Sequence, residues 1–176
     1  MKVRRVVTGV NSDGKATVVS DTAVPPITLQ MIPGWEFHKL WGADEPVVLP
    51  SDGSLPSFPK YYPPPGGFRF GLFTVPPMTE VNTEEQDAEA ALQELEEKLP
   101  GMAEHLEEED PGMHTTDTVD FEYVISGEVW LELDDGEEVH LKAGDTLVQN
   151  GTRHAWRNKS KEPCVLFACL IGVARR

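Results

Sequence analysis

The chain has 176 residues, 39% of them hydrophobic, which is enough for one hydrophobic core with peripheral extensions. Thirty acidic side chains against fifteen basic ones give a formal net charge of −15, which disfavours nucleic acids and anionic membrane surfaces as partners. No apolar run reaches the roughly 18 residues that a membrane span needs, and no secretion signal follows the basic start. We expect one cytoplasmic domain over residues 1–176.

The first segments of the chain favour extended structure. Residues 3–9 and 16–20 are rich in β-branched side chains, and the turn residues at 11–14 join them, which is typical of a hairpin. Residues 35–41 alternate large apolar and polar side chains, as a half-buried strand does. We expect this third segment to belong to the same sheet system.

A proline-rich stretch separates these segments from the next strand. Prolines are dense from residue 46 to residue 65, which excludes helix and central strand and predicts a covering loop. Residues 68–75 are again typical of a strand, and Pro76 and Pro77 end it.

Residues 83–99 predict one amphipathic helix, because apolar positions recur at spacings of three and four between glutamates. Pro100 and Gly101 end it, and the acidic run 107–110 that follows is expected to be a solvated face. The chain therefore divides into N-terminal strands with the proline-rich loop (1–82), an acidic helical insert (83–110) and a C-terminal part (111–176).

The C-terminal part predicts short antiparallel strands. Extended segments at 119–125, 128–133, 139–141 and 146–148 alternate with turn residues at about ten-residue spacing. The apolar run 164–171 reads as a core strand, with Cys164 and Cys169 as reduced thiols. The pattern predicts an all-β protein built as an antiparallel sandwich or barrel.

Three stretches of this part, 127–136, 144–145 and 151–158, resemble the two conserved-motif regions of the cupin superfamily. Residues 4–9, 63–67 and 114–120 are similar to small single-domain members of the cupin type-2 conserved-barrel family. The resemblance implies a cupin-type antiparallel β-barrel, a jelly-roll-like double-stranded β-helix, with N-terminal strands and one inserted helix.

The resemblance also implies a metal site. Cupin motifs place three histidines and a carboxylate around a divalent metal inside the barrel, and here His114, Asp120 and His154 match three of those four positions. Thr116 stands where the second histidine is common, and Asp120 replaces a glutamate. The implied ligands are His114, Asp120 and His154, and such a set suits iron, manganese, nickel or zinc.

Further residues are candidates for binding and catalysis. Glu122 shares strand parity with Asp120 and could replace it or act as a general acid or base, whereas a strand-end position would expose it. Thr116 could bond a bound water, and Trp156 could stack on a planar substrate. Arg153 could hold a substrate carboxylate, or form a surface ion pair. Three other histidines are expected on the surface: His38, His105 and His140.

The favoured interpretation is a metal-dependent enzyme that acts on a small carbonyl or carboxylate compound, by decarboxylation or oxygenation. One alternative is a metal-free lyase, isomerase or cyclase in which His114, Glu122 and His154 exchange protons. Another is a cupin that binds a small ligand without catalysis. From the resemblance we also expect a homodimer, to which the hairpin at 3–20 could contribute.

Overall fold

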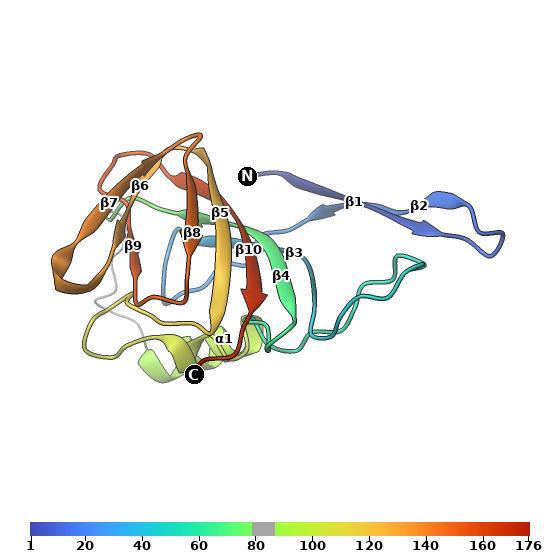
Figure 1. The fold of residues 1–176 in the computed structure, drawn as a ribbon. Helices are drawn as coiled ribbons and strands as arrows, with labels where there is room; N and C mark the ends of the chain where they lie inside the picture. Colours follow the sequence, from blue (N-terminus) through green and yellow to red (C-terminus); the bar gives the residue numbers. More distant parts are fainter. Residues whose placement is uncertain (79–86) are drawn as a thin grey trace.

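The computed structural model describes residues 1–78 and 87–176. Its strands form three antiparallel sheets, and one α-helix accompanies them (Figure 1). The strands are β1 (Val3–Val10), β2 (Ala16–Val24), β3 (Glu36–Ala43), β4 (Phe68–Val75), β5 (Thr118–Ser126), β6 (Glu128–Glu132), β7 (Glu138–Lys142), β8 (Thr146–Gln149), β9 (Ala155–Arg157) and β10 (Cys164–Gly172).

The central body consists of two sheets with the strand orders β3-β4-β10-β5-β8 and β7-β6-β9. One core joins them, in which Val124 and Leu166 of the first sheet pack with Leu131 and Trp156 of the second. No ladder of hydrogen bonds within the described residues connects the two sheets. The predicted all-β, antiparallel architecture is confirmed, but within the described residues the sheets form an open sandwich and do not close into a barrel.

Strand alternation decides which side chains enter the space between the sheets. On β5 the even-numbered residues 118–124 are buried, whereas Phe121, Tyr123 and Ile125 are exposed. This is the two-residue period of a strand with one face inward, but here the inward face carries the polar side chains of Asp120 and Glu122. The parity predicted from the sequence is confirmed.

Strands β1 and β2 form a hairpin that extends away from the body (Figure 1). Its turn is held by the Asn11 side chain, whose Oδ1 accepts hydrogen bonds from the backbone N–H groups of Asp13 and Lys15. The proline-rich loop lies beside it, with the Val10 N–H donating to the Ser51 carbonyl at 2.9 Å. We call residues 3–24 and 46–58 the arm.

Helix α1 (Ala88–Lys98) lies at one end of the body (Figure 1). The Asp87 side chain caps it by accepting hydrogen bonds from the N–H groups of Glu89 and Ala90, and Ala91 and Leu95 are buried. The helix predicted over 83–99 is confirmed for this part, and its first residues lie outside the described chain. In the part of the chain that the structure describes, no helix is long and apolar enough to cross a membrane.

Candidate functional site

A cavity of about 540 Å³ lies between the two sheets and reaches the α1 end of the body. Its wall is largely aromatic, and its polar lining comes mainly from β5 and from the segments around residues 114 and 154. A large apolar pocket with a few convergent polar groups is typical of a small-molecule site. The aromatic lining residues are Trp35, Phe37, Tyr61, Tyr62, Phe73 and Trp156.

Two carboxyl groups from β5 line this cavity. Asp120 is 4% exposed and Glu122 is 8% exposed, and Asp120 Oδ1 and Glu122 Oε2 are buried without a hydrogen-bond partner among the described residues. Burial raises the pKa of Asp120 to about 6, because the charged form loses its hydration. Burial, and then the charge of Asp120, raise the pKa of Glu122 well above its ordinary value. At neutral pH Asp120 is therefore mostly ionised, and Glu122 favours its protonated form more strongly than an exposed glutamate does.

His114 and His154 form the second polar pair of the lining. The Nδ1–H of His114 donates to the Gly112 carbonyl at 3.0 Å, and that of His154 donates to the Thr152 carbonyl at 2.9 Å. A carbonyl only accepts, so the neutral form of each ring presents Nε2 as a lone pair. Burial lowers the pKa of both rings, that of His154 to about 4, so both are neutral at pH 7.

The predicted metal ligands are only partly brought together. The rings of His114 and His154 lie side by side, but within residues 1–78 and 87–176 no group of three or more His, Cys, Asp or Glu side chains is arranged to hold a metal ion. Two imidazole lone pairs do not fit the three-ligand site that the cupin resemblance implies. The set His114, Asp120 and His154, and a bound iron, manganese, nickel or zinc, stay a prediction.

Thr116 and Trp156 both line the cavity. The hydroxyl of Thr116 is buried and hydrogen-bonds the hydroxyl of Thr118 at 2.8 Å, so the protein already satisfies it. The indole of Trp156 lies edge-on to the ring of His154, with 6.0 Å between the ring centroids, and tilted against Phe73. Trp156 is therefore placed to contact a ligand beside the histidine pair.

Arg153 does not reach the cavity lining of the described residues. Its guanidinium donates to Glu107 at 2.7 Å, to Asp110 at 2.9 Å and to Asp134 at 3.1 Å. These charge-assisted bonds use the donors that a substrate carboxylate would need. The predicted substrate contact is corrected, and the surface ion pair weighed against it is the arrangement that the structure shows.

Tyr61 and Tyr62 are lining residues that sequence reasoning missed. They lie at the end of the proline-rich stretch, and their rings meet edge-to-face with 4.9 Å between centroids. Burial raises the pKa of both hydroxyls, and the charges of Asp120 and Glu122 add to this effect. In the sequence, the only signal for these lining residues was the pair of adjacent aromatic side chains in the loop. Such a pair does not show that this part of the loop packs against the cavity.

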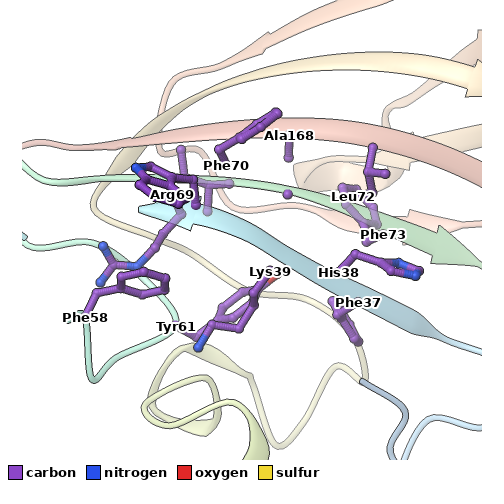
Figure 2. A pocket seen from close by; sticks show the side chains of 13 residues that line it. Phe37, His38, Lys39, Phe58, Tyr61, Arg69, Phe70, Leu72, Phe73 and Ala168 are labelled. Atoms are coloured by element: carbon purple, nitrogen blue, oxygen red, sulfur yellow. The ribbon is translucent and has the colours of Figure 1, made fainter. Parts of the chain in front are cut away.

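A second pocket, of about 30 Å³, lies beside β3 and β4 (Figure 2). Arg69 dominates one side of it, with its guanidinium carbon 4.7 Å from the centroid of the Phe58 ring. The same guanidinium donates to Asp44 at 2.5 Å and to the carbonyls of Lys60 and Ala43. These bonds fasten the loop to the sheet, so this pocket has a structural explanation.

His38 also borders the second pocket, on β3 (Figure 2). It is 1% exposed, both ring nitrogens are without a partner among the described residues, and burial lowers its pKa. The prediction that it lies on the surface was wrong. The alternation of β3 does not reveal that a polar position is covered by other parts of the chain.

The motifs predicted a cupin-type antiparallel β-barrel, and the described residues form the antiparallel strands of such a fold as an open sandwich of eight strands. Residues 103–170 match the family model Cupin_2, described as cupin domain. The structure is similar to that of the cupin domain of Cnp3 from Schizosaccharomyces pombe, with a TM-score of 0.50, 11% sequence identity, and coverage of 98% of this chain and 89% of that one. Residues 103–170 are therefore similar in sequence to a cupin domain, and the structure shares the cupin fold.

Two curated proteins share a short segment with the chain. Oryzines biosynthesis cluster protein J of Aspergillus oryzae is 54% identical over 52 residues, which are 30% of this chain and 29% of that protein. Phomopsin biosynthesis cluster protein C' of Diaporthe leptostromiformis is 52% identical over 48 residues, which are 27% of this chain and 25% of that protein. The match spans less than a third of either relative.

Proposed function

We propose that the cavity binds a small carbonyl compound and that Asp120 and Glu122 move protons on it without a metal. The reaction class is that of the metal-free lyase, isomerase or cyclase considered from the sequence. The observation that supports it is the pair of buried carboxyl groups, each with an oxygen that no described residue bonds, in the wall of a cavity of ligand size. A buried polar atom without a partner is costly unless a ligand or solvent satisfies it.

The two carboxyl groups suit different roles. The carboxylate of Asp120 accepts a proton from the carbon next to the carbonyl, and the carboxylic acid of Glu122 donates its proton to the carbonyl oxygen. The C–H bond breaks, its electron pair forms the C=C bond of an enol, and the proton count is conserved. Return of a proton at another carbon gives an isomer, and departure of a neighbouring group gives a lyase reaction.

Strand geometry places the two carboxyl groups side by side. Asp120 and Glu122 are two residues apart on one face of β5, so their Cα atoms are about 7 Å apart. The lone pairs of the histidine pair can accept hydrogen bonds from hydroxyl groups of the substrate. The aromatic wall supplies apolar surface in the same cavity as the carboxyl groups.

Metal-dependent decarboxylation or oxygenation is the second candidate. The adjacent rings of His114 and His154, with 4.2 Å between their centroids, are the observation that favours it. Because no third ligand joins them in the described residues, we derive no step through a metal. Ligand binding without catalysis is the third candidate, and only a turnover experiment separates it from the other two.

The test is exchange of carbon-bound protons for deuterium. A panel of small aldehydes and ketones is incubated with the purified chain in D₂O, with and without EDTA, and the signals next to the carbonyl are followed by proton NMR. We expect EDTA-resistant loss of signal that Asp120→Asn and Glu122→Gln slow by about 100-fold or more. Glu137→Gln, an exposed acidic position outside the cavity, is the matched control.

Equal exchange in wild type and both carboxyl variants would contradict the proposal. Exchange that EDTA abolishes and one of the four metals restores would replace it with the metal-dependent candidate.

A further inference from the structure

We propose that the ligand of this cavity is a small organic amine that is protonated at neutral pH and carries an apolar body. The inference rests on the proposed function, because it names the substrate class of the same site. The observation that carries it is the juxtaposition of two unpartnered buried carboxyl oxygens with a wall of aromatic rings.

The charges of the lining favour a cation. The acidic lining residues are Asp120 and Glu122 on β5 and Glu107 and Glu108 in the acidic run 107–110. Among the described lining residues the only arginine or lysine is Arg157.

Arg157 is fully engaged by the protein. Its Nε donates to Glu132 at 2.5 Å, one terminal nitrogen donates to the Pro111 carbonyl at 2.7 Å, and the other lies 3.5 Å from Asp110. Arg153 is likewise paired with Glu107 and Asp110 of the acidic run 107–110. Among the described residues, the cavity therefore offers an incoming carboxylate no unpaired arginine or lysine. The carboxylate substrates considered from the sequence are therefore disfavoured, and a positive charge is favoured.

The hydrogen-bonding groups of the lining favour a donor. Asp120 Oδ1 accepts, and so do the Nε2 lone pairs of His114 and His154. The amide of Asn158, a potential competing donor, is already used by the carbonyls of Val75 and Glu162. An ammonium group has three donors and no acceptor, which is the complement of such a lining.

The aromatic wall suits both parts of this ligand. Stacked or edge-to-face contacts link Trp35, Phe37, Tyr61 and Tyr62, with centroid separations between 4.9 and 6.0 Å, and Trp156 contacts Phe73 on the other side. Ring faces attract cations and ring bodies bury apolar surface. A neutral alcohol gains only the burial of its apolar surface, and a ligand with a carboxylate is repelled by the carboxyl groups of the cavity.

The test compares three ligands of one shape: phenethylamine, 2-phenylethanol and 3-phenylpropionate. Their affinities for the full chain are measured by isothermal titration calorimetry at pH 7.5 and low salt. We expect the amine to bind at least about tenfold more tightly than the alcohol, and the acid to bind most weakly. Asp120→Asn is expected to remove most of this preference, because it removes the carboxylate, while alcohol binding persists, which also shows that the variant is folded. Glu122→Gln, which replaces one neutral group by another, is expected to remove less of it. Glu137→Gln is expected to change none of the three affinities.

The proposal is overturned if the acid binds as tightly as the amine, if Asp120→Asn keeps the amine preference, or if none of the three ligands binds. Binding is read here without turnover, so the two proposals fail separately. If the amine binds but no amino ketone exchanges its protons, only the proposed function is contradicted. If neutral ketones exchange their protons but the amine is not preferred, only the ligand class is contradicted.

Discussion

His114 and His154 form an isolated antiparallel bridge in which each backbone N–H donates to the other residue's carbonyl at 3.0 Å, and their rings lie 4.2 Å apart between centroids. The bridge joins the segment before β5 to the segment before β9. It explains how two histidines that are 40 positions apart in the sequence reach one wall of the cavity.

This histidine pair leads to a prediction on metal content. We expect the purified, tag-free chain to hold less than one tightly bound ion, because the described residues place no third ligand beside the two neutral imidazoles. Elemental mass spectrometry of wild type and a His114→Ala, His154→Ala variant measures this. Iron, manganese, nickel or zinc near one ion per chain, lost in the double variant, would instead establish the ligand set inferred from the motifs.

Asp120 makes folding stability depend on pH. Its pKa is about 6 in the folded chain and about 4 unfolded, so the unfolded carboxyl ionises first as pH rises. The cost of ionising Asp120 in the folded chain is absent below about pH 4 and complete above about pH 6. There it lowers the free energy of unfolding by about 3 kcal/mol. We expect Asp120→Asn to gain stability relative to wild type across that range, as measured by urea unfolding at pH 4 and pH 7. A difference that does not grow with pH would contradict the assigned burial effect.

The two carboxyl groups also predict the pH dependence of proton exchange. The rate rises as Asp120 becomes the carboxylate around pH 6 and falls at higher pH as Glu122 loses its proton, so the profile is bell-shaped. The exchange rate measured by NMR from pH 4 to pH 10 tests this. In Glu122→Gln we expect the alkaline limb to disappear. A profile that stays flat through pH 6 would remove Asp120 as the base.

Arg153 is predicted to stabilise structure and not to bind the ligand. It joins Glu107 and Asp110 to Asp134, so Arg153→Ala should release the acidic segment and lower the Tm. Affinity for an uncharged probe such as 2-phenylethanol should stay within about twofold, since the arginine is not among the described lining residues. Calorimetry and thermal unfolding measure the two effects. Loss of affinity for 3-phenylpropionate alone would restore the carboxylate contact inferred from the sequence.

The outer face of the five-stranded sheet is apolar along its central row. The strand registers align this row across all five strands, Trp41, Phe70, Cys169, Phe121 and Val148, and Leu72, Phe167 and Tyr123 lie beside it. Exposed aromatic side chains, here Phe70, Phe121 and Tyr123, are typical of the centre of a protein interface.

The arm extends apolar side chains away from the body. Its charges balance, because residues 3–24 and 46–58 carry three basic and three acidic side chains. A two-stranded hairpin that leaves the body gains little stability alone, and the arm exposes Val6, Val18 and Leu49. The arm of one copy is thus suited to lie over the apolar sheet face of a second copy, and two-fold symmetry satisfies both.

We therefore expect a homodimer whose mass is twice that of the 19.5 kDa chain, measured by light scattering after size exclusion. Phe121→Glu with Tyr123→Glu should give monomers, because the charges would be buried at the interface. Val139→Glu changes an exposed apolar residue of the other sheet and should leave the dimer intact. A wild-type chain that is monomeric at all concentrations would contradict this expectation.

The local fold could be read from the sequence because it depends on periodicity. The strand β4, the inward phase of Asp120 and Glu122, and the helix around Leu95 follow from repeats of two and of three to four residues. The motif resemblance picked out His114 and His154 because they match the first histidine of one cupin motif and the last histidine of the other. These are relationships between residues that are close in sequence or fixed by a strand.

Only the tertiary structure decided how distant segments meet. It showed that Arg153 is held by an acidic segment more than forty residues away, that His38 is covered, and that Tyr61 returns from a loop to the cavity wall. It also separated the two sheets and, among residues 1–78 and 87–176, placed no third ligand beside the histidine pair. Sequence patterns report the preference of each segment for a face or a conformation. Partners across the fold depend on packing between segments, and no local period encodes that packing.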